Sequence, residues 1–155
     1  MSGLRGVAVA VVAVVSLTTT EAAASDETDV MAVVKDYNAA LNTGDQKRAA
    51  ADCAKKLSIT DEFAPYSWQG ADALAGWFRD YAGWTKQNVV TDDSVALATP
   101  WRLEVDGDRA YAVVPADFTY TKRGAQVVEA GSVWTFALQK TTGHWRIVSW
   151  AWAEH

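Results

Sequence analysis

The sequence has 155 residues, of which 14 are Lys or Arg and 19 are Asp or Glu, so the formal net charge at neutral pH is -5. Half of the residues are hydrophobic and eight are Trp, which is enough apolar material for the core of a single domain. The acidic balance argues against a nucleic-acid partner, because contacts to phosphates require an excess of Lys and Arg.

Residues 1–24 have the composition of a signal peptide. Arg5 is the only early positive charge, residues 6–15 are apolar, and Ala22, Ala23 and Ala24 form an A-x-A cleavage site. The apolar run is too short to span a bilayer. We therefore expect a secreted or periplasmic protein that keeps no membrane attachment after cleavage, with residues 25–155 as one domain. A membrane anchor or a misassigned start are the alternatives.

Two helices are predicted next. Apolar residues recur at intervals of three and four, which places them on one helical face: Val30, Val33, Val34, Tyr37, Ala40 and Leu41. Tyr37 then points inward, with its hydroxyl either satisfied in the core or aimed into a cavity. Gly44 ends this helix and Asp45 caps a second one, expected to reach Lys56 and to be followed by an extended link over residues 57–63.

A third helix follows the break at residues 68–70. Its apolar positions are again at helical spacing, namely Leu74, Trp77, Phe78 and Tyr81, and Gly83 comes after it. From residue 88 onward, turn signals at residues 106–108, 122–124 and 141–144 separate runs rich in β-branched and aromatic residues. Helices first and strands later predict an α+β domain whose second half is an antiparallel meander.

Alternation assigns faces to these strands. The first predicted face comprises Ala110, Ala112, Val114, Ala116, Phe118 and Tyr120; the next strand places Ala130, Ser132, Trp134, Phe136 and Leu138 together; the last places Trp150 and Trp152 together. Pro115 suggests a sheet edge or a bulge, because it has no N–H to donate. So many large rings either fill a core or line a cavity.

The sequence lacks the residue patterns for a disulfide, a metal site, nucleotide binding or serine hydrolysis. The single cysteine, Cys53, allows no internal disulfide and is expected to be a small buried thiol among alanines. Neither His144 nor His155 has a second metal ligand at helical or hairpin spacing, so no metal site is expected. No phosphate loop, dinucleotide fingerprint or nucleophile elbow is present, and we expect no cofactor.

Three motifs carry a resemblance. Residues 33–45 (VVKDYNAALNTGD), 68–70 (WQG) and 143–150 (GHWRIVSW) are similar, in order and spacing, to the nuclear transport factor 2-like superfamily with its SnoaL-like domains, and together cover nearly all of residues 29–153. The resemblance implies a cone-shaped, cystatin-like α+β fold, in which three N-terminal helices pack on a strongly curved, mainly antiparallel sheet with a pocket in its mouth. It also implies that a homodimer through the outer sheet face is common.

Within that superfamily, the resemblance to ketosteroid isomerase implies site residues. The helix tyrosine falls on Tyr37, the aspartate base on Asp61, and a protonated aspartate on Ser132. A serine hydroxyl is a far poorer proton donor than a protonated acid, which argues against steroid isomerisation. What remains is general-base chemistry of the isomerase, cyclase or dehydratase kind, with Asp61 taking a proton next to a carbonyl and Tyr37, assisted by Ser132, hydrogen-bonding the oxyanion.

The expected partner is a small apolar molecule of the carbonyl type. Inward phase combined with the resemblance selects as ligand-binding residues Phe63, Tyr66, Trp68, Trp77, Phe118, Trp134 and Trp150. Trp84, Trp101 and Trp145 are expected to be packing or surface rings. The alternative to an enzyme is a non-catalytic module that binds an apolar ligand or another protein, because this scaffold carries both kinds of function.

Overall fold

The structure is a computed structural model that describes residues 18–154, with side chains from Ser25 onward. Its helices are α1 (Thr18–Asn42), α2 (Gln46–Asp52) and α3 (Ala73–Asn88), and its strands are β1 (Cys53–Thr60), β2 (Ser67–Gly70), β3 (Val90–Leu97), β4 (Arg102–Asp106), β5 (Arg109–Lys122), β6 (Ala125–Thr141) and β7 (His144–Ala153). No helix in the described part of the chain combines the length and the apolar character needed to cross a membrane.

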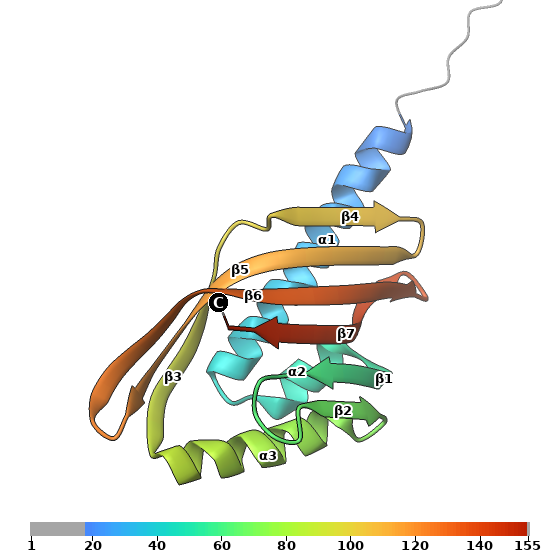
Figure 1. The fold of residues 1–155 in the computed structure, drawn as a ribbon. Coiled ribbons are helices and arrows are strands. Elements are labelled where there is room, and N and C mark those ends of the chain that lie inside the picture. The colour runs from blue at the N-terminus through green and yellow to red at the C-terminus, as the bar shows by residue number, and fades with distance from the viewer. Residues whose placement is uncertain (1–17, 155) are drawn as a thin grey trace, which may run out of the picture.

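The strands form one curved mixed sheet in the order β2-β1-β7-β6-β5-β3, and β4 also pairs with β5. All pairs are antiparallel except β1 with β7, which is parallel. Figure 1 shows β5 and β6 bending away toward β3, α1 crossing one face of the sheet, and α3 lying across the end near β2. The predicted α+β fold, with three helices on a strongly curved and mainly antiparallel sheet, is confirmed.

Helix α1 carries the predicted buried face but is longer than expected. Val30, Val34, Tyr37 and Ala40 are all fully buried, whereas the helix already begins at Thr18. Gly44, at φ +67°, closes its C-terminus with backbone hydrogen bonds from residues 44 and 45 back to the carbonyls of residues 41 and 40, which is a Schellman motif. Of the predicted signal peptide, residues 1–17 lie outside the described residues and residues 18–24 form the first turns of α1.

The predicted second helix was too long. Asp45 caps it as expected, accepting a hydrogen bond from the backbone N–H of Arg48 at 3.0 Å, but α2 ends at Asp52 and strand β1 begins at Cys53. Strand β1 lies between β2 and β7, so it gains hydrogen bonds on both edges and buries Leu57 and Ile59. These tertiary contacts outweigh the helix propensity of the Ala-rich stretch.

Two other predicted boundaries differ. Residues 68–70, expected to be a break, belong to β2, in which Trp68 lies opposite Ile59. Helix α3 continues through Gly83 to Asn88 and ends at Val89 in the left-handed conformation, at φ +55°. A glycine inside a helix costs only about 1 kcal/mol, and the extra turn places the ring of Trp84 against the ring of Tyr120 on the sheet.

The predicted hairpins and the buried face of β5 are confirmed. Pro115 lies where the outer partner of β5 changes from β4 to β3, and a bulge follows it between Ala116 and Phe118. On β6 the opposite side of this bulge is Gly131, at φ +76°, whose N–H donates to Asp117 Oδ1 at 2.9 Å. The extra residue shifts the alternation, so Ala130 is exposed rather than sharing a face with buried Ser132.

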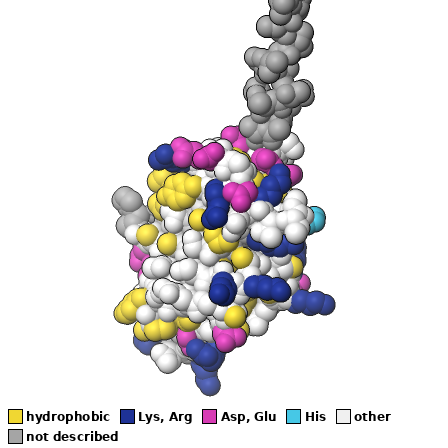
Figure 2. Space-filling view, turned by 90° about the vertical axis from the view of Figure 1, so that its right-hand side faces the viewer, with side chains coloured by type: hydrophobic (Ala, Val, Ile, Leu, Met, Phe, Trp, Pro, Cys, Tyr) yellow, Lys and Arg dark blue, Asp and Glu magenta, His cyan; other side chains and the backbone are white. Residues whose placement is uncertain are grey.

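One face of the molecule is mixed in the character of its side chains. The face in Figure 2 carries acidic, basic and small hydrophobic patches interspersed, without a continuous area of one charge.

Candidate functional site

A cavity of about 360 Å³ opens inside the curve of the sheet, beside α3 and the C-terminal end of α1. Its aromatic lining consists of Phe63, Trp77, Phe78, Tyr81, Trp84, Phe118, Trp134, Trp150 and Trp152. The polar lining consists of Asn42, Gln46, Asp61, Glu62, Thr85, Asp93 and Ser94. Among the described residues, no Lys, Arg or His lines it. Such a mainly aromatic lining with a few polar groups is typical of a site for a small molecule.

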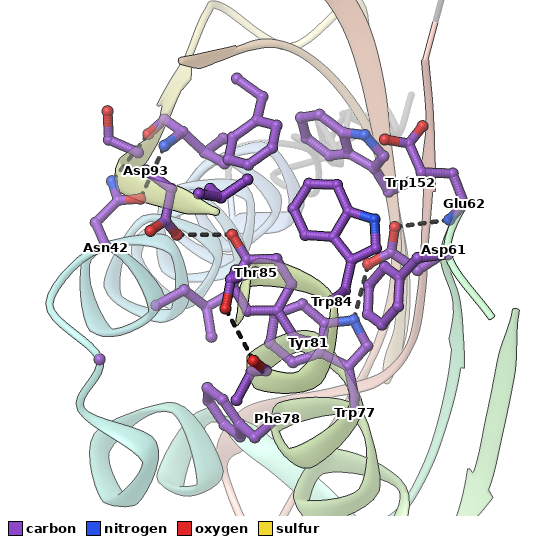
Figure 3. Close-up of a pocket in the computed structure, with 18 of the residues that line it drawn as sticks. Asn42, Asp61, Glu62, Trp77, Phe78, Tyr81, Trp84, Thr85, Asp93 and Trp152 are labelled. Atoms are coloured by element: carbon purple, nitrogen blue, oxygen red, sulfur yellow. Dashed lines mark hydrogen bonds between the residues drawn. The ribbon is translucent and has the colours of Figure 1, made fainter. Parts of the chain in front are cut away.

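Asp61 is positioned by the end of β1. Its backbone N–H donates to the carbonyl of Tyr66 at 3.1 Å, which closes the loop between β1 and β2. The carboxylate accepts two hydrogen bonds, from Trp77 Nε1 to Oδ2 at 2.7 Å and from the backbone N–H of Glu62 to Oδ1 at 2.8 Å (Figure 3). Burial raises the pKa of Asp61 to about 6, against the lowering effect of these hydrogen bonds. At neutral pH this buried carboxylate is therefore mostly ionised and still basic enough to accept a proton.

Helix α3 supplies a rigid aromatic wall. Trp77, Tyr81 and Trp84 follow one another at intervals of four and three residues, so their rings lie on one helical face. The rings of Trp77 and Tyr81 are stacked with centroids 5.0 Å apart, and those of Tyr81 and Trp84 with centroids 5.9 Å apart. Trp150 meets Trp77 edge-on at 5.4 Å from the sheet side. The cavity is thus shaped before any ligand enters.

Asp93 lies across the aromatic rings from Asp61 (Figure 3). Its Oδ2 accepts a hydrogen bond from the hydroxyl of Tyr81 at 2.6 Å, and burial raises the pKa of that tyrosine well above its ordinary value. Asn42, at the end of α1, holds β3 in place, because its side chain both donates to the carbonyl and accepts from the N–H of Val95, at 2.9 and 2.8 Å. These two hydrogen bonds between Asn42 and Val95 fix the position of strand β3, which carries Asp93.

Further carboxylates gather next to Asp61. Oxygen atoms of Glu62, Glu129 and Glu154 lie within 4.8 Å of one another. Burial, followed by the negative charges of Glu129 and Glu154, raises the pKa of Glu62 to about 7. Glu129 accepts a hydrogen bond from the hydroxyl of Tyr120 at 2.7 Å. Groups of acidic side chains at a surface are common without an ion, so this trio alone defines no metal centre.

Six of the residues predicted from the sequence line the cavity: Asp61, Phe63, Trp77, Phe118, Trp134 and Trp150. Tyr37 is not among the lining residues. It is fully buried against the rings of Trp134 and Trp150, and its hydroxyl accepts a hydrogen bond from Trp150 Nε1 at 2.9 Å. Of the two alternatives for Tyr37, this geometry is that of a satisfied core ring.

Ser132, Tyr66 and Trp68 also lie outside the lining. Ser132 is fully buried, and its hydroxyl makes only a long contact of 3.4 Å with the carbonyl of Glu129. Tyr66 is 59% exposed in the β1–β2 loop. Trp68 is buried against Phe63, with ring centroids 5.1 Å apart, and its Nε1 donates to Asp80 at 2.8 Å. Tyr37, Asp61 and Ser132 therefore do not converge in one cavity.

Several lining residues were missed from the sequence. Tyr81 was placed on a buried helical face without a site role, and Trp84, which follows the predicted helix end at Gly83, was expected to be a packing or surface ring. Continuing the helical spacing would have found both. Trp152 shares the predicted face of Trp150. Asp93 had no signal, because a register shift in β3 between Thr91 and Ser94 decides where its side chain points.

Trp101 and Trp145 agree with the expectation of packing or surface rings, whereas Cys53, expected to be a buried thiol, is only partly buried. Trp101 is 68% exposed, and Trp145 is buried with Lys140 over its ring. Burial raises the pKa of the Cys53 thiol to about 12, so its reactive thiolate form is suppressed.

Comparisons with known proteins agree on one family. The family model described as "SnoaL-like domain" matches residues 22–151. No curated protein matches the sequence significantly. Among solved structures, a nuclear transport factor 2-like protein with a cystatin-like fold from Novosphingobium aromaticivorans has a TM-score of 0.72 and 17% identity, with 92% of each chain covered.

Two further structures have names that indicate an activity. A ketosteroid isomerase-like protein from Erwinia carotovora atroseptica has a TM-score of 0.66 and 18% identity, covering 83% of this chain and 95% of its own. A type 2 hexachlorocyclohexane dehydrochlorinase has a TM-score of 0.66 and 14% identity, covering 88% of this chain and 86% of its own. At these identities the likeness shows a shared fold alone.

Proposed function

This chain belongs to the SnoaL-like domain family, and on that premise we propose that it binds a small apolar molecule in the aromatic cavity and removes a proton from one of its carbon atoms. Asp61 is the general base. The single observation that carries the proposal is the carboxylate of Asp61 in the cavity lining, held by Trp77 Nε1 at 2.7 Å, with its pKa raised by burial to about 6. A base with a pKa near the working pH combines the ionised form with enough proton affinity.

The lining also limits the substrate. Tyr37 and Ser132, the expected oxyanion donors, lie outside the cavity lining, and the hydroxyl of Tyr81 already donates to Asp93. Without a strong donor, the enzyme needs a substrate whose C–H bond is already acidic, such as carbon between an aromatic ring and a carbonyl. The proton moves from that carbon to an oxygen of Asp61, and the electron pair is delocalised onto the carbonyl oxygen.

The names of two similar structures support this class of reaction. One is an isomerase-like protein and the other a dehydrochlorinase. The alternative is binding without turnover, which is favoured by the position of Tyr37 outside the lining. The proposal is therefore tested on proton transfer itself, separately from binding.

The test uses 2-tetralone, a small aromatic ketone with acidic carbon-bound protons. Exchange of these protons for deuterium is followed by ¹H NMR in D₂O with the wild-type protein, Asp61→Asn and, as a matched control, the exposed Asp29→Asn. We expect the wild type and the control to accelerate exchange, and Asp61→Asn to lose about 100-fold or more of the acceleration. Binding of the ketone without accelerated exchange would leave only the non-catalytic alternative.

We also propose that residues 1–24 are removed during export and that the mature chain forms a homodimer through the outer face of the sheet. The export proposal is supported by the charge, apolar run and Ala-x-Ala site of those residues. The dimer proposal is supported by two exposed rings, Trp101 before β4 and Tyr111 on the outer side of β5.

A further inference from the structure

The charged side chains of the cavity lining all have one sign. Asp61, Glu62 and Asp93 are acidic, and within the part of the chain that the structure describes none of them takes part in a salt bridge. The hydrogen-bond donors to Asp61 and Asp93 are neutral, namely an indole, a backbone N–H and a phenol. Figure 3 shows Asp61 and Glu62 on one side of the aromatic rings and Asp93 on the other. Negative charge therefore borders the cavity from two sides.

More negative charge stands directly beside the lining. Glu129 and Glu154 place carboxylate oxygens within 4.8 Å of those of Glu62. Glu129 Oε2 is buried without a hydrogen-bond partner among the described residues, although its other oxygen is paired with Tyr120. Lys122 offsets part of the charge on Glu129. The pKa of both Glu62 and Glu129 is nevertheless raised, so the free protein holds these charges together against burial and mutual repulsion.

The rest of the lining favours a particular kind of cation. The faces of Trp and Tyr rings attract a positive charge, and the attraction increases when the site excludes water. An inorganic ion would have to give up its water for aromatic carbon, which provides no ligand atoms. An organic ammonium group bonded to carbon suits both features, because its apolar substituents pack on the rings while its charge faces the carboxylates.

We propose that the molecule bound in this cavity is a small apolar cation, a tertiary or quaternary ammonium compound, whose charged nitrogen lies beside Glu62. This inference rests on the proposed function, since it names the ligand class of the same cavity. A cationic substrate would also provide the positive charge that the cavity lining lacks. A positive charge within the substrate stabilises the negative charge that develops when Asp61 removes a proton, a task for which the lining has no strong free donor.

The test compares two probes of the same shape. Phenyltrimethylammonium and tert-butylbenzene differ by a charged nitrogen in place of a carbon, and the cation loses more hydration on binding. Each is titrated into the full-length protein at pH 7.5 while the indole N–H signals are followed by ¹H–¹⁵N NMR. Despite its hydration, we expect the cation to bind about tenfold more tightly than the hydrocarbon, the size of a desolvated cation–π and charge contribution.

Two variants identify the source of the preference. Glu62→Gln should weaken the cation about three- to tenfold and leave the hydrocarbon unchanged, because one exposed charge is removed without a change of shape. Glu104→Gln, a charge removal on β4 away from the cavity, should change neither affinity. Glu62 is exposed, so its variant keeps the fold.

The outcomes separate this inference from the proposed function. Equal affinities, tighter binding of the hydrocarbon, or equal effects of Glu62→Gln on both probes would overturn the cationic ligand class and leave the apolar pocket standing. Binding of neither probe would overturn the inference together with the proposed binding function.

Discussion

The indole N–H of Trp77 donates a hydrogen bond of 2.7 Å to the carboxylate of Asp61, although the two residues are 16 positions apart in the chain. Helix α3 supplies the donor, and the residue that directly follows strand β1 supplies the acceptor. The bond orients the proposed base of the cavity and lowers the pKa of Asp61 against the effect of burial.

Replacing Trp77 by Phe should shift the pH dependence of proton exchange. The variant loses the main hydrogen bond to the ionised form of Asp61, so the pKa of Asp61 rises above its value of about 6. Because the base works when ionised, the rising limb of the rate against pH moves to higher pH. The measurement is the pH profile of 2-tetralone exchange, with exposed Trp101→Phe as the control. An unshifted limb together with a lower rate would mean that the bond does not tune the base.

The stability of the protein should fall as the pH rises from about 4 to about 7. The pKa values of Asp61 and Glu62 are raised in the folded protein, to about 6 and about 7, so between their ordinary and raised values the folded state binds more protons than the unfolded state. Asp26, Asp36 and Asp80 have lowered pKa values, and their stabilising contribution is lost only in more acidic solution.

This dependence is measured as the melting temperature at pH 5.0 and pH 7.5. The wild type should melt at the higher temperature at pH 5.0, and Glu62→Gln should reduce the difference, because one of the carboxyl groups with a raised pKa is gone; Asp52 and Glu129 also have raised pKa values and remain. A melting temperature that increases toward pH 7.5 would contradict the assignment of both groups.

Replacing Tyr37 by Phe should affect stability rather than chemistry. The variant leaves the buried N–H of Trp150 without its acceptor, which costs about 1–3 kcal/mol. Urea unfolding measures that loss, and the exchange rate of 2-tetralone per folded molecule should stay within about threefold of wild type. A loss of about 100-fold or more in rate with unchanged stability would instead restore Tyr37 as an oxyanion donor.

Export should shorten the chain at the residues 22–24. The protein is expressed in a secreting host with a C-terminal tag, purified and weighed by mass spectrometry. Its mass should be that of a chain whose first residue is at or near Ser25. Such a chain keeps Asp26, whose carboxylate is bonded to Lys140 and Trp145 and ties α1 to β6 and β7. A protein that retains Met1 and stays in the cytoplasm would contradict the export proposal.

The mature chain should have the mass of a dimer in size-exclusion chromatography with light scattering. Tyr111 is 41% exposed, whereas its neighbours Ala110 and Ala112 are buried, so its ring lies on the outer face of the sheet. A charge at this position would lose its hydration in an interface, so Tyr111→Glu should give a monomer. The thermal unfolding of the variant, followed by the fluorescence of the cavity Trp residues, should be unchanged. A monomeric mass for the unmodified mature chain would refute the proposal.

Local patterns were sufficient for much of the fold. The spacing of Val30, Val34, Tyr37 and Ala40 identified the buried face of α1, because every turn of a helix returns a side chain to the same direction. Gly44 and the glycines of the later turns marked element ends, because they adopt positive φ at little cost. The buried side of β5 followed from its alternation alone.

Contacts distant in sequence decided the rest. Only the pairing of β1 with both β2 and β7 ends α2 at Asp52. Only the bulge at Gly131 exposes Ala130 while Ser132, two residues later, is buried. The same holds for the site: Asp61 and Trp77 were both singled out from the sequence, but the hydrogen bond between them and the charges around Asp61 were not. Periodicity reports the direction of a side chain within its own element, whereas a cavity depends on how separate elements pack, which no local pattern encodes.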